Sequence, residues 1–157
     1  MAAIPEGPSP FPWPPALLLA AVAGAFVLGR AVPLAWPGID DLPARVVGAL
    51  LILGGVGIFV WAARTLASHN TTIIPTKAAD NLVTGGPFRW RRNPIYLADV
   101  LILLGVAILT RNIWFAILSL VFAALVTWLA ILPEERHLEA RFGDAYRDYK
   151  AKTRRWI

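Results

Sequence analysis

The stretch IYLADVLILLGVAILTRNIWFAILSLVFAALVTWLAIL, residues 95–132, decides the fold. It contains two apolar runs, 95–110 and 113–132, and the link between them is formed by Thr110, Arg111 and Asn112. A connector this short forces the two helices to run antiparallel as neighbours. We therefore expect a helical hairpin whose two open ends, the start of the first helix and the end of the second, lie on the same side of a membrane.

Two further apolar runs precede this hairpin. Residues 16–36 would cover about 30 Å as a helix, enough for a bilayer core, and within 43–67 the part 46–63 carries no charge. The chain is 57% hydrophobic, with a mean hydropathy of +0.60, well above a soluble domain. The sequence thus predicts an all-α integral membrane protein, a single domain over 1–157 with about four transmembrane helices.

The two ends of the chain differ in character from these runs. Residues 1–15 hold six prolines and no Lys or Arg, so we expect an extended leader that is not a cleaved signal peptide. Residues 133–152 are expected to form a C-terminal amphipathic helix that starts at Pro133 and lies against the membrane surface or the hairpin. Its aromatic face would comprise Leu138, Phe142, Tyr146 and Tyr149.

Charge gives the expected orientation. Of the 15 Lys and Arg residues, only Arg30, Arg45 and Arg111 lie on one side of a four-span topology; the rest, Lys77 included, share the other side. The positive-inside rule makes that richer side cytoplasmic, with both termini inside, as in a bacterial inner membrane. Topology accounts for the net charge of +5, so we expect no nucleic-acid partner, and the chain has no cysteine for disulfide or thiolate chemistry.

A polar connection over residues 69–94 leads into the hairpin, and a loop of that length is usually functional or disordered. It includes GGPFRWRRNP at 85–94, whose arginines can hold an anionic ligand or lipid headgroups. The hairpin geometry brings Arg92 and Tyr96 towards Glu134 and Glu135 at the cytoplasmic boundary. A site there can take a charged cofactor from the cytosol and a greasy acceptor from the lipid.

Two segments of the chain resemble a known family. LVTGGPFRWRRNPIY at 82–96 and EERHLEARFGDAYRDY at 134–149 are similar to the two signature blocks of the isoprenylcysteine carboxyl methyltransferase and phospholipid methyltransferase superfamily, here as a small bacterial-type member. Their order, their spacing and the hairpin between them agree with the family pattern. The resemblance covers about residues 72–157.

The resemblance implies methyl transfer from S-adenosylmethionine, bound without a Rossmann fold, to a small lipophilic or membrane-embedded acceptor. It implies Arg92 and Glu134 as catalytic residues. The implied cofactor-binding residues are Leu82, Val83, Phe88, Arg92, Asn93, Pro94, Tyr96, Glu134 and Glu135. Independently of the family, an arginine such as Arg92 can clamp the cofactor's carboxylate, and a carboxylate can bind its ammonium and ribose hydroxyls.

Three positions depart from the family pattern. Asn93 stands where the family commonly has histidine and cannot ionise near neutral pH, which rules out acid/base work there. Phe88 replaces a usual tyrosine. Ala130 occupies the position of an arginine that meets the substrate carboxylate in the eukaryotic isoprenylcysteine branch, which argues against a prenylcysteine acceptor.

Other interpretations stay open at this point. The fold can serve a non-catalytic membrane interaction protein or a sterol-reductase-like NADPH enzyme, Glu134 and Glu135 can cap a helix, and Asp99 can be functional or pair with an arginine near the headgroups. We expect no metal site, because neither histidine has a second ligand at metal spacing. The glycines of the second span, 48, 54, 55 and 57, favour close helix packing and leave room for a homodimer.

Overall fold

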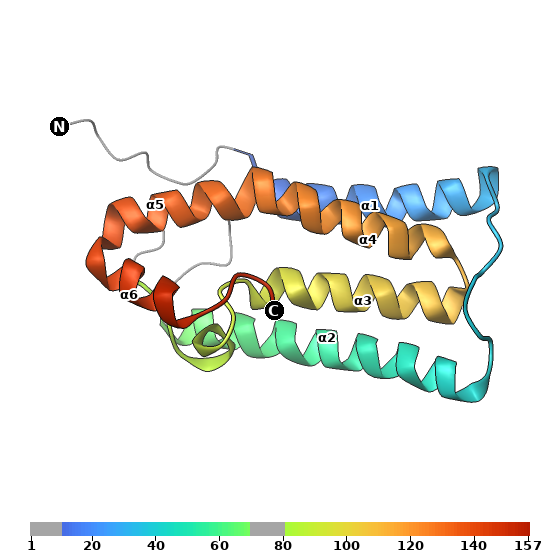
Figure 1. Ribbon diagram of the computed structural model, residues 1–157, viewed down its shortest axis with the longest axis horizontal. Coiled ribbons are helices and arrows are strands. Elements are labelled where there is room, and N and C mark those ends of the chain that lie inside the picture. The colour runs from blue at the N-terminus through green and yellow to red at the C-terminus, as the bar shows by residue number, and fades with distance from the viewer. Residues whose placement is uncertain (1–10, 70–80) are drawn as a thin grey trace.

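The computed structural model describes residues 11–69 and 81–157. The predicted extended leader falls largely on residues 1–10, and Lys77 on residues 70–80, so both lie outside the described part. Four apolar helices form an antiparallel bundle (Figure 1): α1 Trp13–Ala31, α2 Leu42–Ser68, α3 Pro94–Thr110 and α4 Ile113–Val126. Helix α2 packs along α3, α1 packs along α4, and α3 and α4 join the two pairs.

The predicted hairpin of α3 and α4 is confirmed. Arg111 ends α3 in the left-handed conformation, with φ of 52°, and the Asn112 side chain caps α4 by accepting from the Trp114 amide at 3.1 Å. The Asn112 side-chain amide also donates to the Ala25 carbonyl at 2.9 Å, which ties the turn to α1. The reversal therefore fixes the start of α3 and the end of α4 at the same end of the bundle.

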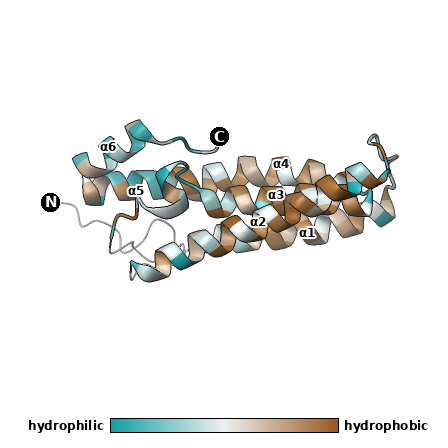
Figure 2. Cartoon of the chain, turned by 90° about the horizontal axis from the view of Figure 1, so that it is seen from below, coloured by the Kyte–Doolittle hydropathy of each residue, from teal (hydrophilic) through white to brown (hydrophobic). Residues whose placement is uncertain are grey.

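By length and composition, three helices of the described residues can cross a membrane: Trp13–Ala31, Leu42–Ser68 and Ile113–Phe142, of which α4 is the first part. Helix α3, with 17 residues, is shorter but equally apolar and is packed between its neighbours. Figure 2 shows the contrast along the molecule: the bundle is mainly hydrophobic, whereas the elements beyond α4 at one end are mainly hydrophilic. We call this end, which carries the C-terminal helices, the cap end.

Small residues allow α2 and α3 to approach closely. A Cβ placed on Gly105 would lie 2.6 Å from the Gly48 carbonyl oxygen, and one on Gly55 would lie 2.9 Å from the Ala98 carbonyl oxygen. Both are backbone contacts that a side chain cannot relieve without separating the helices. The packing role predicted for the glycines thus holds for Gly48 and Gly55, whereas Gly54 and Gly57 have no described atom within 4 Å of such a Cβ.

The limits of the first helix differ from those predicted. Helix α1 begins at Trp13 and not at residue 16, because Pro14 and Pro15 occupy its first turn, where no backbone N–H is needed for an intrahelical bond. It ends at Ala31 and not at residue 36. The cause is Pro33, which disfavours helical backbone at Val32, and Val32 has indeed left the helical region, with φ of −134° and ψ of 74°.

The predicted start of a new helix at Pro133 is wrong. Helix α4 continues through a π-helical segment, η2 Thr127–Ile131, directly into α5 Leu132–Phe142. Proline lacks an N–H and clashes with the carbonyl four residues earlier, and the wider π turn accommodates it; the Leu132 amide donates five residues back to Thr127. Consequently Glu134 and Glu135 do not cap a free helix start.

The predicted single C-terminal helix is also broken. Gly143 adopts a φ of +55°, which favours glycine, and separates α5 from α6 Asp144–Lys152. Helix α6 folds back towards the start of α3, and the chain ends beside that helix (Figure 1). The tail therefore covers the cap end of the hairpin instead of extending as one amphipathic rod.

Candidate active site

The site is assembled at the cap end from segments far apart in the chain. The first turn of α3 and the short 3-10 turn before it, η1 Gly86–Arg89, contribute one side, and α5 contributes the other. The last residues, 153–157, return between them; we call these five residues the C-terminal strap. An isolated β-bridge between Arg91 and Arg154 joins the strap to the segment that enters α3.

Local sequence explains how the entry segment is placed. Gly86 has a φ of +57°, and a Cβ there would lie 2.5 Å from the Thr65 hydroxyl of α2, so glycine is required. Pro87 is buried, and Pro94 is fully buried in the first turn of α3, where proline is tolerated. These three residues fix both ends of the segment that presents Arg92 and Asn93.

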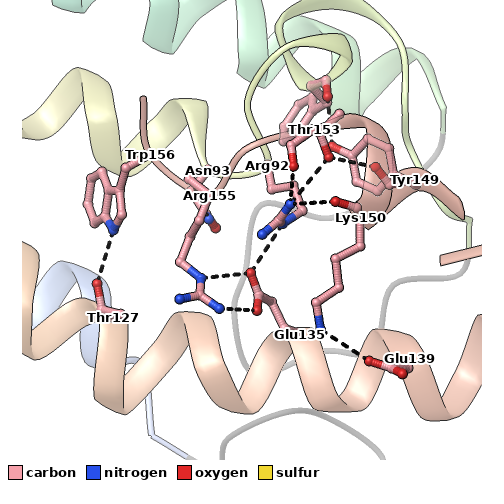
Figure 3. A network of polar contacts seen from close by, with 11 residues as sticks. Arg92, Asn93, Thr127, Glu135, Glu139, Tyr149, Lys150, Thr153, Arg155 and Trp156 are labelled. Carbon is pink, nitrogen blue, oxygen red and sulfur yellow. Dashed lines mark hydrogen bonds and ion pairs between the residues drawn. The ribbon is translucent and has the colours of Figure 1, made fainter. Parts of the chain in front are cut away.

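A buried ion-pair cluster lies at the centre of the site (Figure 3). Arg92 Nε is 3.2 Å from Glu135 Oε1, while Arg155 donates to the same carboxylate twice, from Nε at 3.0 Å and from Nη2 at 2.7 Å. The side chains of Arg92 and Glu135 are only 10% and 7% exposed. We call these three residues the arginine cluster; hydrogen bonding to Glu135 raises the pKa of Arg155. The predicted approach of Arg92 to Glu135 is thus confirmed.

The guanidinium of Arg92 is largely committed to the protein itself. Its Nη1 donates to the Lys150 carbonyl at 3.1 Å and to the Thr153 carbonyl, and it lies 3.5 Å from the Thr153 hydroxyl. Nearby, the Tyr149 hydroxyl donates to the Phe88 carbonyl at 2.7 Å, and burial raises the pKa of Tyr149 to about 12. Arg92 therefore connects the segment before α3 with α5 and α6, and only its Nη2 is left without a hydrogen bond to a described residue; its role as a ligand clamp stays a prediction.

The strap is held on both sides of Arg155. The Arg92 amide donates to the Arg154 carbonyl at 2.9 Å, and the Asn93 side-chain amide donates to the Arg155 carbonyl at 3.1 Å. The Trp156 indole donates to the Thr127 hydroxyl in the π-helical segment at 3.2 Å. Asn93 thus uses its hydrogen-bonding group to anchor the strap.

A second polar group lies alongside, and we call it the acidic group: Tyr96, Asp99 and Glu134. Tyr96 lies near both Glu134 and Asp99, and Glu134 directly precedes Glu135 in the chain. Asp99 is 9% exposed. Within residues 11–69 and 81–157, the side chains of these three residues form no hydrogen bond or ion pair. Two carboxylates here therefore have no cationic partner among the residues that the structure describes.

The other predicted residues lie close to these groups along the chain. Val83 is buried and Leu82 half-buried just before η1, and Phe88 belongs to η1 itself. Over the described ranges, no three His, Cys, Asp or Glu side chains gather closely enough to hold a metal ion.

Sequence reasoning missed the contribution of Thr153, Arg155 and Trp156. These residues lie beyond the last helix and follow no helical period. The one available signal was the arginine pair at 154 and 155, which reads equally well as positive-inside charge.

Comparisons with known proteins show a match to one protein family and to two individual proteins. Residues 43–145 match the model of the phospholipid methyltransferase family, a range that includes Arg92 and Glu135 but stops before the strap. Over 65 residues the chain is 38% identical to an uncharacterised protein of Haemophilus influenzae, which covers 40% of this chain and all of that one. Over 112 residues it is 30% identical to the nickel-cobalt-cadmium resistance protein NccN of Alcaligenes xylosoxydans xylosoxydans, covering 67% of this chain and 48% of that protein. No solved structure matches.

Proposed function

The chain belongs to the phospholipid methyltransferase family, and from that premise we propose that it transfers the methyl group of S-adenosylmethionine to a small lipophilic acceptor that reaches the site from the bilayer. The cap end, which holds most of the cations, would face the cytoplasm of a bacterial cell, where the donor is dissolved. The earlier alternatives, an interaction protein and a nicotinamide-dependent reductase, become outcomes of the tests below.

The observation that carries the proposal is the division of charge at the cap end. The arginine cluster holds two guanidinium groups and one carboxylate, which leaves an excess positive charge. The acidic group holds two carboxylates that lack a cationic partner in the part of the chain that the structure describes. Neighbouring excesses of opposite sign complement a zwitterion. S-adenosylmethionine has an amino-acid part with one carboxylate and one ammonium, and its sulfonium adds positive charge.

The charges of the two groups suggest a role for each residue. Glu134 and Asp99 would attract the ammonium and the sulfonium, and the Tyr96 hydroxyl would bind a polar group of the donor. Arg92, Asn93 and Glu135 would hold the frame. Leu82, Val83, Phe88 and Pro94 would line the apolar part of the site.

When bound, the donor supplies an electrophilic methyl carbon, and the reaction is a displacement at that carbon. The protein's contribution would then be alignment of the two reactants and exclusion of water, both of which depend on a rigid site. The firmly tied arginine cluster suits such a task. In this scheme Glu134 is the predicted catalytic residue that meets the donor, whereas Arg92 acts through Glu135.

Binding of S-adenosylhomocysteine, the demethylated donor, is the direct test. We expect saturable one-to-one binding to the protein in detergent by calorimetry, together with a higher thermal unfolding midpoint, since a ligand that binds only the folded state stabilises it. NADPH titrated in the same way should not bind. A cooperatively unfolding protein that gives no heat with S-adenosylhomocysteine would reject the proposal, and binding of NADPH instead would support the reductase.

The acceptor can then be sought directly. The protein is incubated with donor labelled in its methyl group and a total lipid extract, and labelled products are separated. A labelled lipophilic product that depends on Glu134 would support methyl transfer. Donor binding without any labelled product in a lipid extract from the source organism would favour the non-catalytic interaction protein.

A further inference from the structure

We propose that Arg155, on the C-terminal strap, binds the carboxylate of the methyl donor's amino-acid part. This inference rests on the proposed function and assigns to Arg155 the role that sequence reasoning gave to Arg92. It also gives the strap, which lies outside the residues that match the family, a part in ligand binding.

The charge balance of the arginine cluster points to Arg155. Arg92 and Glu135 together are neutral and are the two most deeply buried members, with side chains 10% and 7% exposed. Arg155 supplies the excess positive charge, and its side chain is 36% exposed. A ligand carboxylate would therefore meet the charge at the accessible guanidinium.

The geometry of the guanidinium group agrees with this assignment. Arg155 uses Nε and Nη2 to hold both oxygens of Glu135, and its Nη1 makes no hydrogen bond with any residue that the structure describes. Arg92 also keeps one terminal nitrogen, Nη2, without a hydrogen bond to a described residue, but its side chain is only 10% exposed, so a ligand reaches the guanidinium of Arg155 more readily. Arginine can bind one carboxylate through one edge and a second carboxylate through its remaining N–H groups.

The position of Arg155 is fixed before any ligand arrives. The carbonyls of Arg154 and Arg155 accept hydrogen bonds from the Arg92 amide and the Asn93 side chain, and Trp156 is tied to Thr127 in the π-helical segment. Backbone anchors thus lie on both sides of the residue. A preorganised donor group loses little conformational entropy on binding, which favours affinity.

The test compares two ligands that differ in one group. S-adenosylhomocysteine and its decarboxylated analogue, which keeps the adenosyl, thioether and amine groups, are titrated into wild type, Arg155→Gln, Arg155→Lys and, as a matched control, Lys152→Gln. Lys152 is an exposed cation at the end of α6, three residues before Arg155, with no hydrogen bond or ion pair to described residues. Its replacement removes one positive charge from the same region without touching the cluster.

We expect Arg155→Gln to lose roughly 10- to 100-fold in affinity for S-adenosylhomocysteine, the range that a charge-assisted hydrogen bond contributes. Affinity for the decarboxylated analogue should change less than about threefold, and this retained binding would also show that the variant is folded. Arg155→Lys should recover part of the loss, because it keeps the charge but not the fork geometry. Lys152→Gln should bind both ligands as wild type does.

The outcomes separate this inference from the function it rests on. If wild type binds neither ligand, the proposed function fails. If wild type binds S-adenosylhomocysteine but Arg155→Gln weakens both ligands equally, Arg155 only supports the fold, and the inference is wrong. If donor affinity is unchanged while the KM of an identified acceptor rises, the carboxylate belongs to the acceptor, and the inference is likewise overturned.

Discussion

The arginine cluster and the acidic group are neighbours, and both contain carboxylates. They differ in whether those carboxylates are paired with cations. In the arginine cluster, Glu135 receives three hydrogen bonds from two guanidinium groups. In the acidic group, Asp99 and Glu134 have no cationic partner in the described ranges. Buried charges are costly unless they are paired, so removing one partner from the first group would destabilise the fold, whereas the carboxyl groups of the second are neutralised either by protonation or by a bound cation. In the proposed function the arginine cluster is therefore the structural frame, and the acidic group binds the ligand.

The strongest way to break this contrast is Glu135→Ala. The substitution leaves the buried guanidinium of Arg92 and the partly exposed one of Arg155 without their carboxylate, and loss of one partner of a buried pair costs about 3–5 kcal/mol. We expect a clear drop in the thermal unfolding midpoint in detergent, together with loss of S-adenosylhomocysteine binding.

Glu139→Ala is the control for this change. Glu139 lies one turn further along α5 and pairs with Arg147 at 3.3 Å and Lys150 at 3.4 Å, but its side chain is 37% exposed. Exposed pairs contribute only about 0–1 kcal/mol, so its loss should be small. Equal effects of the two substitutions would show that Glu135 is no more structural than a surface residue.

Glu134→Gln addresses the other half of the comparison. Removing a carboxylate that has no partner among the described residues should leave the unfolding midpoint unchanged or raise it. Affinity for S-adenosylhomocysteine should fall by about 1.5–3 kcal/mol, the contribution of a hydrogen bond to a charged group. Calorimetry and thermal unfolding on the same sample separate the two effects. A variant that loses stability but keeps its affinity for S-adenosylhomocysteine would show that Glu134 supports the fold and does not bind the ligand.

Asp99→Asn should act in the same direction with a smaller effect. Asp99 is an acid inside an apolar helix, one turn beyond Tyr96, and a neutral amide is less costly to bury there. We expect the free energy of unfolding to rise by about 1 kcal/mol in the absence of ligand. A fall in the unfolding midpoint would mean that Asp99 is stabilised by a partner within the folded protein.

The smallest effect is expected from loosening the contact between Asn93 and the strap. Asn93→Ala removes the hydrogen bond from the Asn93 side chain to the Arg155 carbonyl, a neutral bond worth about 1 kcal/mol. Because other anchors hold the strap, we expect a modest loss of stability and a few-fold loss of S-adenosylhomocysteine affinity. Faster trypsin cleavage after Arg154 and Arg155, followed by mass spectrometry, would report the loosened strap, and an unchanged rate would show that the bond is dispensable.

The hairpin and the approach of Arg92 to Glu135 could be predicted from the sequence, because both follow from local rules. Two apolar helices separated only by Thr110, Arg111 and Asn112 must pack against each other in antiparallel orientation. Charge and hydropathy then placed the arginines and the acids at the same end.

The strap and the π-helical segment could not be predicted in this way. Residues 153–157 have no periodic pattern, and their conformation is set by hydrogen bonds to Arg92, Asn93 and Thr127, which come from distant parts of the chain. Pro133 has two local interpretations, a helix start or an interior residue accommodated by a wider turn. Packing of α5 against the rest of the cap end decides between them, and the sequence pattern alone cannot.

The unbroken helix from Ile113 to Phe142 has a consequence for the reaction as a whole. Its 30 residues extend about 45 Å, whereas the hydrocarbon layer of a bilayer is about 30 Å thick. In a bilayer the same helix would border the lipid over part of its length and would carry Glu134 and Glu135 beyond the hydrocarbon layer. Lipids with longer acyl chains would draw this helix deeper or change its tilt, so under the proposed function hydrophobic mismatch would set how far the methyl donor is held from an acceptor dissolved in the membrane.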